Sequence, residues 1–318
     1  MSFSSKVKDE LARHIGEARH CRIAEIAAII NVCGKIKENE KGEVLSLKIQ
    51  TENAAVARKC FTLLKKTFNI KVEISIKKNI YLKKHRIYHI YVMDSEEALT
   101  ILKVTKLLVN CKVDRHISPL IVQTACCKRA YIRGAFLASG SISDPEKTYH
   151  LEFVNQEEKH TIELMRLVNT FEMDAKIVLR KKYYVLYLKE GNQIVDLLNI
   201  MEAHVALMEL ENLRILKEMR NNVNRIVNCE TANINKTVSA AVKQLQDIGY
   251  IDQTIGLGAL PENLESIARL RIENSDASLT ELGQLLDPVV GKSGVNHRLR
   301  KISQIAEKLK STREEFHD

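Results

Sequence analysis

The side chains best suited to recognise a polyanion lie close together near the C-terminus. Arginine can bind O6 and N7 of guanine, asparagine can bind N6 and N7 of adenine, and lysine contacts phosphates. At about 100° per residue, His297 and Arg300 fall on the side of a helix opposite Val295 and Leu299. This pattern predicts a helix that packs on one side and presents hydrogen-bonding groups to nucleic acid on the other. The candidate contact residues are Lys292, Ser293, Asn296, His297, Arg298, Arg300 and Lys301.

A second, shorter helix must precede this one if the pair is to enter a DNA groove. Ser278 and Glu281 have the spacing of a capping box, which predicts that a helix begins at Leu279. Asp287-Pro288 ends it, and Ser293 is a plausible N-cap for the next helix. The pattern indicates a helix-turn-helix whose second helix enters the major groove. The expected helices of this region span 236–248, 262–273, 279–286 and 294–310.

The alternative interpretation of this helix pair is a surface for protein contact. Residues 259–318 contain nine lysines and arginines and ten acids, so the segment is not basic overall. Only one face carries the surplus of cations. The DNA-binding interpretation is favoured because that face coincides with the helix side that is predicted to be exposed.

A second group of cations lies in the first half of the chain. Between Arg58 and Val92 there are ten lysines and arginines and one acid, Glu73. The net charge of this stretch is therefore +9, the same as the net charge of the whole chain. Such a concentration favours nucleic-acid binding. The alternative is a solvated edge hairpin whose lysines prevent aggregation. Within this stretch, the expected phosphate contacts are Lys77, Lys78, Lys83, Lys84 and Arg86.

The elements that would position these cations occur twice in the sequence. Residues 22–36 and 129–142 are apolar helices with small residues, and they end at Gly34 and Gly140, which are 106 residues apart. Each is followed by an alternating strand, a helix, two more strands and a last helix. Two such copies predict an α+β domain with internal pseudo-twofold symmetry.

Small residues give each of these helices a face that can approach another backbone closely. Ala130, Gly134 and Ala138 recur every four positions. In the first copy a similar stripe of small residues is formed by Ala24, Ala27 and Ala28. We therefore expect the two helices to pack against each other. The glycines at their ends are expected to permit the sharp turns that follow.

The stretches "IRGAFLASG" and "IAAIINVCG" resemble the LAGLIDADG motif of homing endonucleases. Longer segments resemble the bacterial WhiA family: "MSFSSKVKDELARH", "RAYIRGAFLASGSISDPEKTYHLEF", "NCETANINKTV" and "KSGVNHRLRKI". The resemblance implies a degenerate two-repeat LAGLIDADG-like saddle domain, then an all-α helix-turn-helix domain similar to region 4 of sigma factors. We place the first at 1–220, with repeats at about 22–110 and 129–215, and the second at 236–318. Residues 221–235, which are rich in asparagine and lack a long periodicity, are predicted to be a linker.

The motif departs from that of an active endonuclease at its acids. In active members each motif carries an acid before the closing glycine, and the two carboxylates hold a divalent metal that activates water. Here those positions are Cys33 and Ser139, and the earlier acid is replaced by Asn31 and Leu137. Glu25 lies eight residues before Cys33, or about 12 Å along a helix, too far to substitute. No catalytic residue, metal or cofactor is therefore expected.

The remaining composition sets the expected environment of the protein. The seven cysteines are scattered without a CxxC, which favours reduced, buried thiols and makes a zinc site unlikely. His14 and His20 are expected to have surface or capping roles. There is no long apolar run and no signal-peptide pattern, so no membrane association and a cytoplasmic, nucleoid-associated location are expected.

The resulting hypothesis is a sequence-specific transcriptional regulator that binds double-stranded DNA and has no nuclease activity. The resemblance implies a link to sporulation or cell division, and RNA polymerase or another regulator as a candidate protein partner. Three alternatives stay open: a metal-dependent endonuclease or intron maturase, a protein-interaction adaptor, and an RNA-binding protein.

Overall fold

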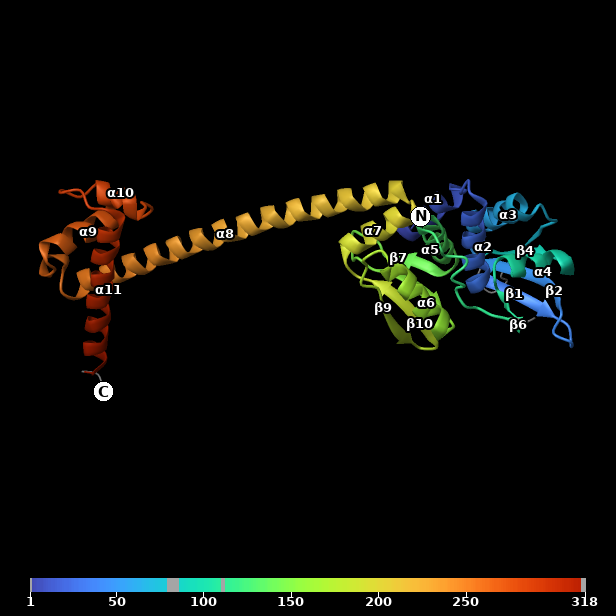
Figure 1. Ribbon diagram of the computed structural model, residues 1–318. Coiled ribbons are helices and arrows are strands. Elements are labelled where there is room, and N and C mark those ends of the chain that lie inside the picture. The colour runs from blue at the N-terminus through green and yellow to red at the C-terminus, as the bar shows by residue number, and fades with distance from the viewer. Residues whose placement is uncertain (1, 79–85, 110–111, 316–318) are drawn as a thin grey trace. The chain divides into compact units, whose positions relative to one another are not determined.

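The computed structural model describes residues 2–78, 86–109 and 112–315 (Figure 1). The chain divides into two compact units, Met1–Glu218 and Met219–Asp318. The first unit is α+β and the second is helical, as the sequence predicted. None of the helices in the described residues is both long and apolar enough to span a bilayer.

The first unit contains the expected repeat. After helix α1 (Phe3–Arg13), the first copy comprises α2 (Arg19–Cys33), β1 (Gly34–Glu38), β2 (Val44–Thr51), α3 (Ala54–Phe68), β3 (Glu73–Lys78), β4 (Arg86–Val92) and α4 (Ser95–Val104). A short hairpin follows, β5 (Leu108–Val109) and β6 (Lys112–Val113). The second copy comprises α5 (Ala125–Ser139), β7 (Gly140–Ile142), β8 (Leu151–Asn155), α6 (Glu158–Asn169), β9 (Lys176–Arg180), β10 (Tyr183–Leu188) and α7 (Gly191–Met201).

The two copies build equivalent antiparallel sheets, ordered β1-β2-β4-β3 and β7-β8-β10-β9. Each sheet has one strand more than the sequence predicted, because β1 and β7 begin at the glycines that close α2 and α5. These strands are short and contain few apolar residues, so the sequence shows no clear alternation of apolar and polar residues that would predict them. Helices α2, α3 and α4 pack on the first sheet, and α5 and α6 pack on the second.

Helices α2 and α5 form the main interface between the copies, as expected from their small residues. A Cβ at Gly134 would lie 2.4 Å from the carbonyl oxygen of Glu25 and 3.0 Å from the Cβ of Ala28. Glycine is therefore required here by the distance between the two backbones.

The glycines that close the two helices have a different role from the one predicted. Gly34 and Gly140 have φ of −78° and −71°, so neither uses the left-handed conformation that favours glycine. A Cβ at Gly34 would lie 2.3 Å from the carbonyl oxygen of Ile30, and one at Gly140 would lie 2.3 Å from Cδ2 of Phe136. Both glycines are needed because a strand starts directly against the last helical turn.

The second unit has its own apolar core. It contains the end of α8 (His204–Thr254), the 3₁₀ turn η1 (Leu257–Ala259), and helices α9 (Glu262–Glu273), α10 (Leu279–Gln284) and α11 (Lys292–Glu315). Val295, Leu299, Ile302 and Ala306 of α11 are buried against α9 and α10. The predicted apolar face of this helix is therefore confirmed.

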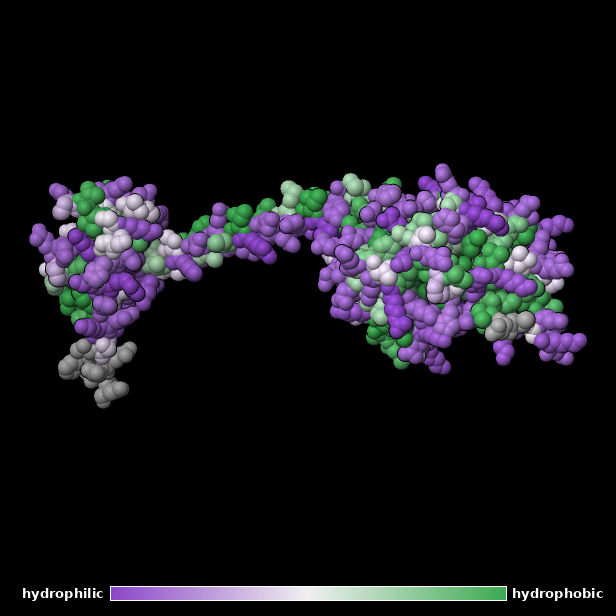
Figure 2. Space-filling model, in the orientation of Figure 1, coloured by the Kyte–Doolittle hydropathy of each residue, from purple (hydrophilic) through white to green (hydrophobic). Residues whose placement is uncertain are grey.

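Residues 221–235 were predicted to be a linker without long periodicity, whereas the structure has a continuous helix there. The physical reason is exposure: every side chain from 218 to 240 is exposed, so no buried face imposes an apolar period on the sequence. Figure 2 shows apolar and hydrophilic residues mixed along the exposed part of α8. The predicted helix at 236–248 is part of α8.

Candidate nucleic-acid interface

The C-terminal ends of α2 and α5 meet in a groove of about 580 Å³. Cys33 and Ser139, the residues at the acid positions of the motif, both line it. The thiol of Cys33 donates to the carbonyl oxygen of Ala138 at 3.5 Å. The hydroxyl of Ser139 donates to the carbonyl of Ala135 and to Oδ1 of Asn155, each at 3.4 Å. The two positions are thus brought together as the motif requires, although the donor groups are neutral.

The chemistry of these side chains does not suit a hard divalent cation. Burial raises the pKa of the Cys33 thiol to about 11, and nearby Lys8 offsets only part of that effect. The thiol is therefore protonated at neutral pH, and a serine hydroxyl is also uncharged. Mg²⁺ and Ca²⁺ prefer anionic oxygen ligands, and neither residue supplies one.

A fixed positive charge lies at the same end of α2. Arg115, from the segment between the repeats, donates NH2 to the carbonyl of Gly34 at 3.0 Å and NH1 to the carbonyl of Asn31. Its Nε lies 3.5 Å from Oε1 of Glu157. A guanidinium in this position complements the negative end of the helix dipole. It also disfavours a second cation in the groove.

The earlier acid positions have structural roles. Leu137 is buried in the core. Asn31 donates from Nδ2 to the carbonyl of Arg115 at 2.8 Å and to the hydroxyl of Tyr131 at 3.2 Å. The same hydroxyl lies 3.2 Å from Nε2 of buried His160. Burial lowers the pKa of His160 to about 4, so the imidazole is neutral and can accept this hydrogen bond.

Glu25, the nearest acid in the helix of the first motif, is paired elsewhere through one carboxylate oxygen, while its Oε2 is buried without a hydrogen-bond partner. Its Oε1 lies 2.6 Å from Nζ of Lys59 and 3.1 Å from Nε of Arg133, and the side chains are 0–3% exposed. Arg133 also binds Oε2 of Glu202 at 2.6 Å, and that carboxylate lies 2.9 Å from Nε2 of His14. Lys59 cannot contact DNA, although it was one of the ten cations counted between residues 58 and 92.

One face of the first sheet carries a cluster of cations that the sequence only partly revealed. By strand register, Lys35 pairs with Lys48, Lys48 with Tyr91, and Gln50 with His89. These residues point away from the face that α2, α3 and α4 cover. We call this surface the lysine face: Lys35, Lys37, Lys48, Gln50, Glu73, Ser75, Lys77, His89 and Tyr91. Glu73, which pairs with Tyr91, places an acid at its edge.

The lysine face has the electrostatics of a cationic surface. Burial lowers the pKa of His89, and Lys48, Lys77 and Lys35 lower it further, because each disfavours a second positive charge. Nζ of Lys48 also lies 5.6 Å from the centre of the Tyr91 ring. Period-two register would have found Lys48, which lies on the alternating strand β2, whereas Lys35 and Lys37 lie on β1, a strand without a clear alternation.

The predicted cations between Lys77 and Arg86 have different placements. Lys77 belongs to the lysine face, and Lys78 is the last residue of β3, paired with Arg86. Arg86 is exposed, but its register places it with Tyr88 and Ile90 on the opposite face. Lys83 and Lys84 lie outside the described residues.

In the second unit, α11 presents the predicted polar residues on its outer side. Lys292, Asn296, Arg300 and Lys301 are exposed. Arg298 is half-buried. Of the acids that the structure describes, none forms an ion pair with these cations, since Glu307 binds Lys243 at 3.1 Å and Asp247 binds Lys310 at 3.1 Å. His297 and Ser293 are also exposed.

The turn between α10 and α11 depends on a close backbone approach. The amide of Val290 donates to the carbonyl of Gly283 at 3.0 Å, and a Cβ at Gly283 would lie 2.1 Å from the carbonyl oxygen of Val290. The predicted capping box of Ser278 and Glu281 is present. The predicted N-cap at Ser293 is wrong, because α11 begins at Lys292 and places Ser293 in its first turn.

Three domain families match consecutive parts of the chain. The WhiA N-terminal LAGLIDADG-like domain matches residues 19–108, and the WhiA LAGLIDADG-like domain matches residues 128–220. The WhiA C-terminal HTH domain matches residues 223–306. These matches cover both repeats and the helical unit.

Similar proteins extend over almost the full chain. A "probable cell division protein WhiA" from Lachnoclostridium phytofermentans is 54% identical over 98% of this chain and 100% of its own length. A protein of the same description from Clostridium botulinum is 53% identical over 98% and 99%. The crystal structure of full-length DUF199/WhiA from Thermatoga maritima covers 97% of this chain and 99% of its own, with 26% identity and a TM-score of 0.61.

Proposed function

The chain belongs to the WhiA family, and we propose that it is a sequence-specific, double-stranded-DNA-binding regulator of transcription without nuclease activity. In this proposal α11 contacts base edges in the major groove, and the lysine face adds contacts to phosphates. The regulated genes would concern cell division, chromosome segregation or sporulation, and the protein would act in the cytoplasm at the nucleoid. The description of the relatives as probable cell division proteins supports the first of these processes.

The observation that carries the proposal is the outer side of α11. It holds exposed arginine, lysine, asparagine and histidine opposite a buried apolar stripe, without acids paired to its cations in the described residues. From Lys292 to Lys301 the helix rises about 14 Å, close to the roughly 12 Å width of the major groove. Arg300 and Asn296 are the proposed base contacts, while Lys292 and Lys301 are the proposed phosphate contacts.

The lack of nuclease activity rests on side-chain chemistry in the groove. Hydrolysis of a phosphodiester by a LAGLIDADG-like site needs an anionic pair to hold the metal that activates water. Cys33 is a protonated thiol, Ser139 is a hydroxyl, and Arg115 adds a positive charge beside them. Plasmid DNA incubated with the full chain and Mg²⁺ or Mn²⁺ should stay intact; metal-dependent cleavage would contradict this part of the proposal.

Chromatin immunoprecipitation with sequencing, using the full chain, tests sequence specificity directly. The proposal expects a set of enriched sites that share a sequence and lie near promoters. Uniform coverage of the genome would contradict it. A purified chain that shows no DNA affinity at low salt would favour an adaptor, whereas preferential binding of an RNA competitor would favour an RNA ligand.

Substitutions then test the assignment of α11. The Asn296→Ala, Arg300→Ala variant should lose about 1–3 kcal/mol for each base contact removed, measured by gel shift on an enriched site. Arg269→Ala on α9 is the matched control, because it removes an exposed arginine that pairs with Glu265 on a different helix. Equal affinities for the control and the double variant would remove α11 as the recognition helix.

A further inference from the structure

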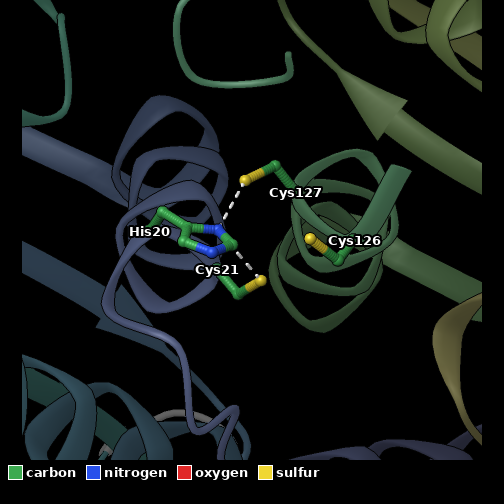
Figure 3. Close-up of side chains that lie close together, drawn as sticks. All are labelled: His20, Cys21, Cys126 and Cys127. Carbon is green, nitrogen blue, oxygen red and sulfur yellow. Dashed lines mark hydrogen bonds between the residues drawn. The ribbon is translucent and has the colours of Figure 1, made fainter. Parts of the chain in front are cut away.

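The thiols of the chain are neither all buried nor scattered, contrary to the sequence-based expectation. Of the six cysteines that the structure describes, Cys126 and Cys229 are exposed. Cys21, Cys126 and Cys127 gather with His20 at the N-terminal ends of α2 and α5 (Figure 3). Figure 3 shows the four side chains directed into the space between the two helices.

The geometry of this cluster suits a four-coordinate metal. Nδ1 of His20 lies 3.1 Å from Sγ of Cys127 and 3.4 Å from Sγ of Cys21. All four candidate ligand atoms lie within 4.8 Å of one another. In a tetrahedral zinc site with Zn–S of about 2.3 Å and Zn–N of about 2.0 Å, neighbouring ligand atoms are roughly 3.5–3.8 Å apart. Small side-chain rotations would therefore bring the four atoms to coordination distance.

The donor set selects among metals. Three thiols and one imidazole are soft or borderline ligands, which Zn²⁺ binds in closed structural sites. Mg²⁺ and Ca²⁺ prefer oxygen ligands and are disfavoured here. Bound thiols coordinate as thiolates, so metal binding would release their protons to solvent.

The internal symmetry of the first unit supports a common function for the four residues. The glycines that close α2 and α5 are 106 residues apart, and the same offset relates His20 to Cys126 and Cys21 to Cys127. The cluster therefore consists of equivalent dipeptides from the two repeats. It faces the pseudo-twofold axis at the end of the helix pair opposite Cys33 and Ser139, about 18 Å away along a helix.

The position of the cluster at two helix N-termini suits anionic ligands and allows access. Both dipeptides, His20-Cys21 and Cys126-Cys127, lie in the first turn of a helix, where the dipole stabilises negative charge. The hydroxyl of Thr124, the N-cap of α5, lies 3.2 Å from Sγ of Cys126 and can orient it. His20 and Cys126 are exposed, so an ion can reach the cluster from solvent.

We propose that His20, Cys21, Cys126 and Cys127 bind one Zn²⁺ ion that links the two repeats. The site is separate from the proposed DNA contacts on α11 and the lysine face. Its role is structural: the ion holds together the starts of α2 and α5, whose interface is the centre of the first unit. A disulfide between two of the three thiols is the competing state of the same cluster.

The metal-free, reduced full chain, titrated with Co²⁺ and then Zn²⁺, tests the proposal. The expected result is thiolate-to-cobalt charge-transfer absorption with the band pattern of a tetrahedral site. Zinc should bleach it at about one ion per chain. Only the weak spectrum of octahedral cobalt, or a disulfide among these thiols that persists in the chain isolated from reducing cytoplasm, would overturn the proposal.

Variants locate the ion in the cluster. Cys126→Ser with Cys127→Ser should abolish the cobalt spectrum and remove zinc from the purified chain, as measured by elemental analysis. Cys229→Ser, which removes an exposed thiol on α8, should keep both signals. If the double variant fails to fold, His20→Gln replaces it, and loss of the tetrahedral spectrum is again expected. Unchanged zinc content in a folded ligand variant would place the ion elsewhere and overturn the assignment.

Discussion

Glu25 of α2 and Arg133 of α5 form an ion pair inside the interface between the two repeats, with 3.1 Å between Oε1 and Nε. Lys59 of α3 binds the same carboxylate oxygen at 2.6 Å, and its Nζ also donates to the carbonyl of Leu11 at 2.9 Å. Burial lowers the pKa of Lys59, while Glu25 raises it and so favours the charged form. One carboxylate therefore connects three helices in a region closed to water.

Glu25→Gln should destabilise the chain strongly. It leaves Lys59 and Arg133 buried with one negative charge fewer, and breaking such a pair costs about 3–5 kcal/mol. The free energy of unfolding from urea titration measures this loss. Glu209→Gln, which breaks the exposed pair with Lys6, is the control and should cost less than about 1 kcal/mol.

A second substitution distinguishes the charge effect from a packing effect. Adding Lys59→Met to Glu25→Gln removes the uncompensated cation, so part of the lost stability should return. A double variant as unstable as the sum of the single variants would show that the charges act independently.

Gly134→Ala should also destabilise the first unit. The added Cβ would lie 2.4 Å from the carbonyl oxygen of Glu25, so α2 and α5 would have to move apart, at a cost of about 1–3 kcal/mol. Gly249→Ala in α8 is the control, because its Cβ would meet no atom within 4 Å. Thermal denaturation should show a lower melting temperature for the first variant only; an unchanged value would show that the interface can relax.

Acidification should destabilise the protein through His160. Its folded pKa of about 4 lies below the usual 6.5, so between these values the unfolded state binds more protons than the folded state. The contribution is fully present above pH 6.5 and is lost as pH falls toward 4; from pH 7 to 5 the loss is on the order of 2 kcal/mol.

His160→Gln isolates that contribution. Its free energy of unfolding should fall less than that of the unmodified chain between pH 7 and 5. Some dependence should persist, because burial also lowers the pKa of His14 and His89. Parallel pH profiles for the two chains would show that His160 is not neutral in the folded state.

The lysine face is expected to set part of the salt dependence of DNA binding. Removing two phosphate contacts with Lys48→Ala and Lys77→Ala should reduce the slope of log K against log salt by about 1.8, since each contact contributes about 0.9. The effect should be similar for specific and nonspecific DNA. Lys176→Ala, whose lysine pairs with Asp174, is the control. An unchanged slope in the double variant would exclude the lysine face from the interface.

Local signals explain what the sequence predicted well. The capping box of α10 was found because its two partners are three residues apart, and the buried face of α11 was found because its apolar period is regular. The repeat was found because its two copies carry matching helices that end in glycine. Each of these features can be recognised from short segments of the sequence, because the residues that define it are close to one another along the chain.

Features that depend on distant contacts were missed or misjudged. Lys59 was counted as a surface cation because its partner Glu25 lies 34 residues earlier. Arg115 donates a hydrogen bond to the carbonyl of Gly34, 81 residues away in the sequence, and no local sequence pattern predicts this contact. The 106-residue offset between Gly34 and Gly140 also relates the starts of the same helices, so it predicts that the cysteines there lie close together.

The arrangement around Arg115 limits which mutations could introduce metal-dependent chemistry into the groove. An acid at position 33 alone would share the groove with the guanidinium of Arg115, which would compete with an ion for the new carboxylate. An acid at position 139 alone would add one carboxylate to a groove in which Glu157 is already paired with Arg115. Loss of the arginine alone would remove the donor to the carbonyls of Asn31 and Gly34 and would also free Glu157, which lines the groove, from its ion pair. A gain of cation affinity in the groove would therefore depend on position 115 as well as on the two motif positions.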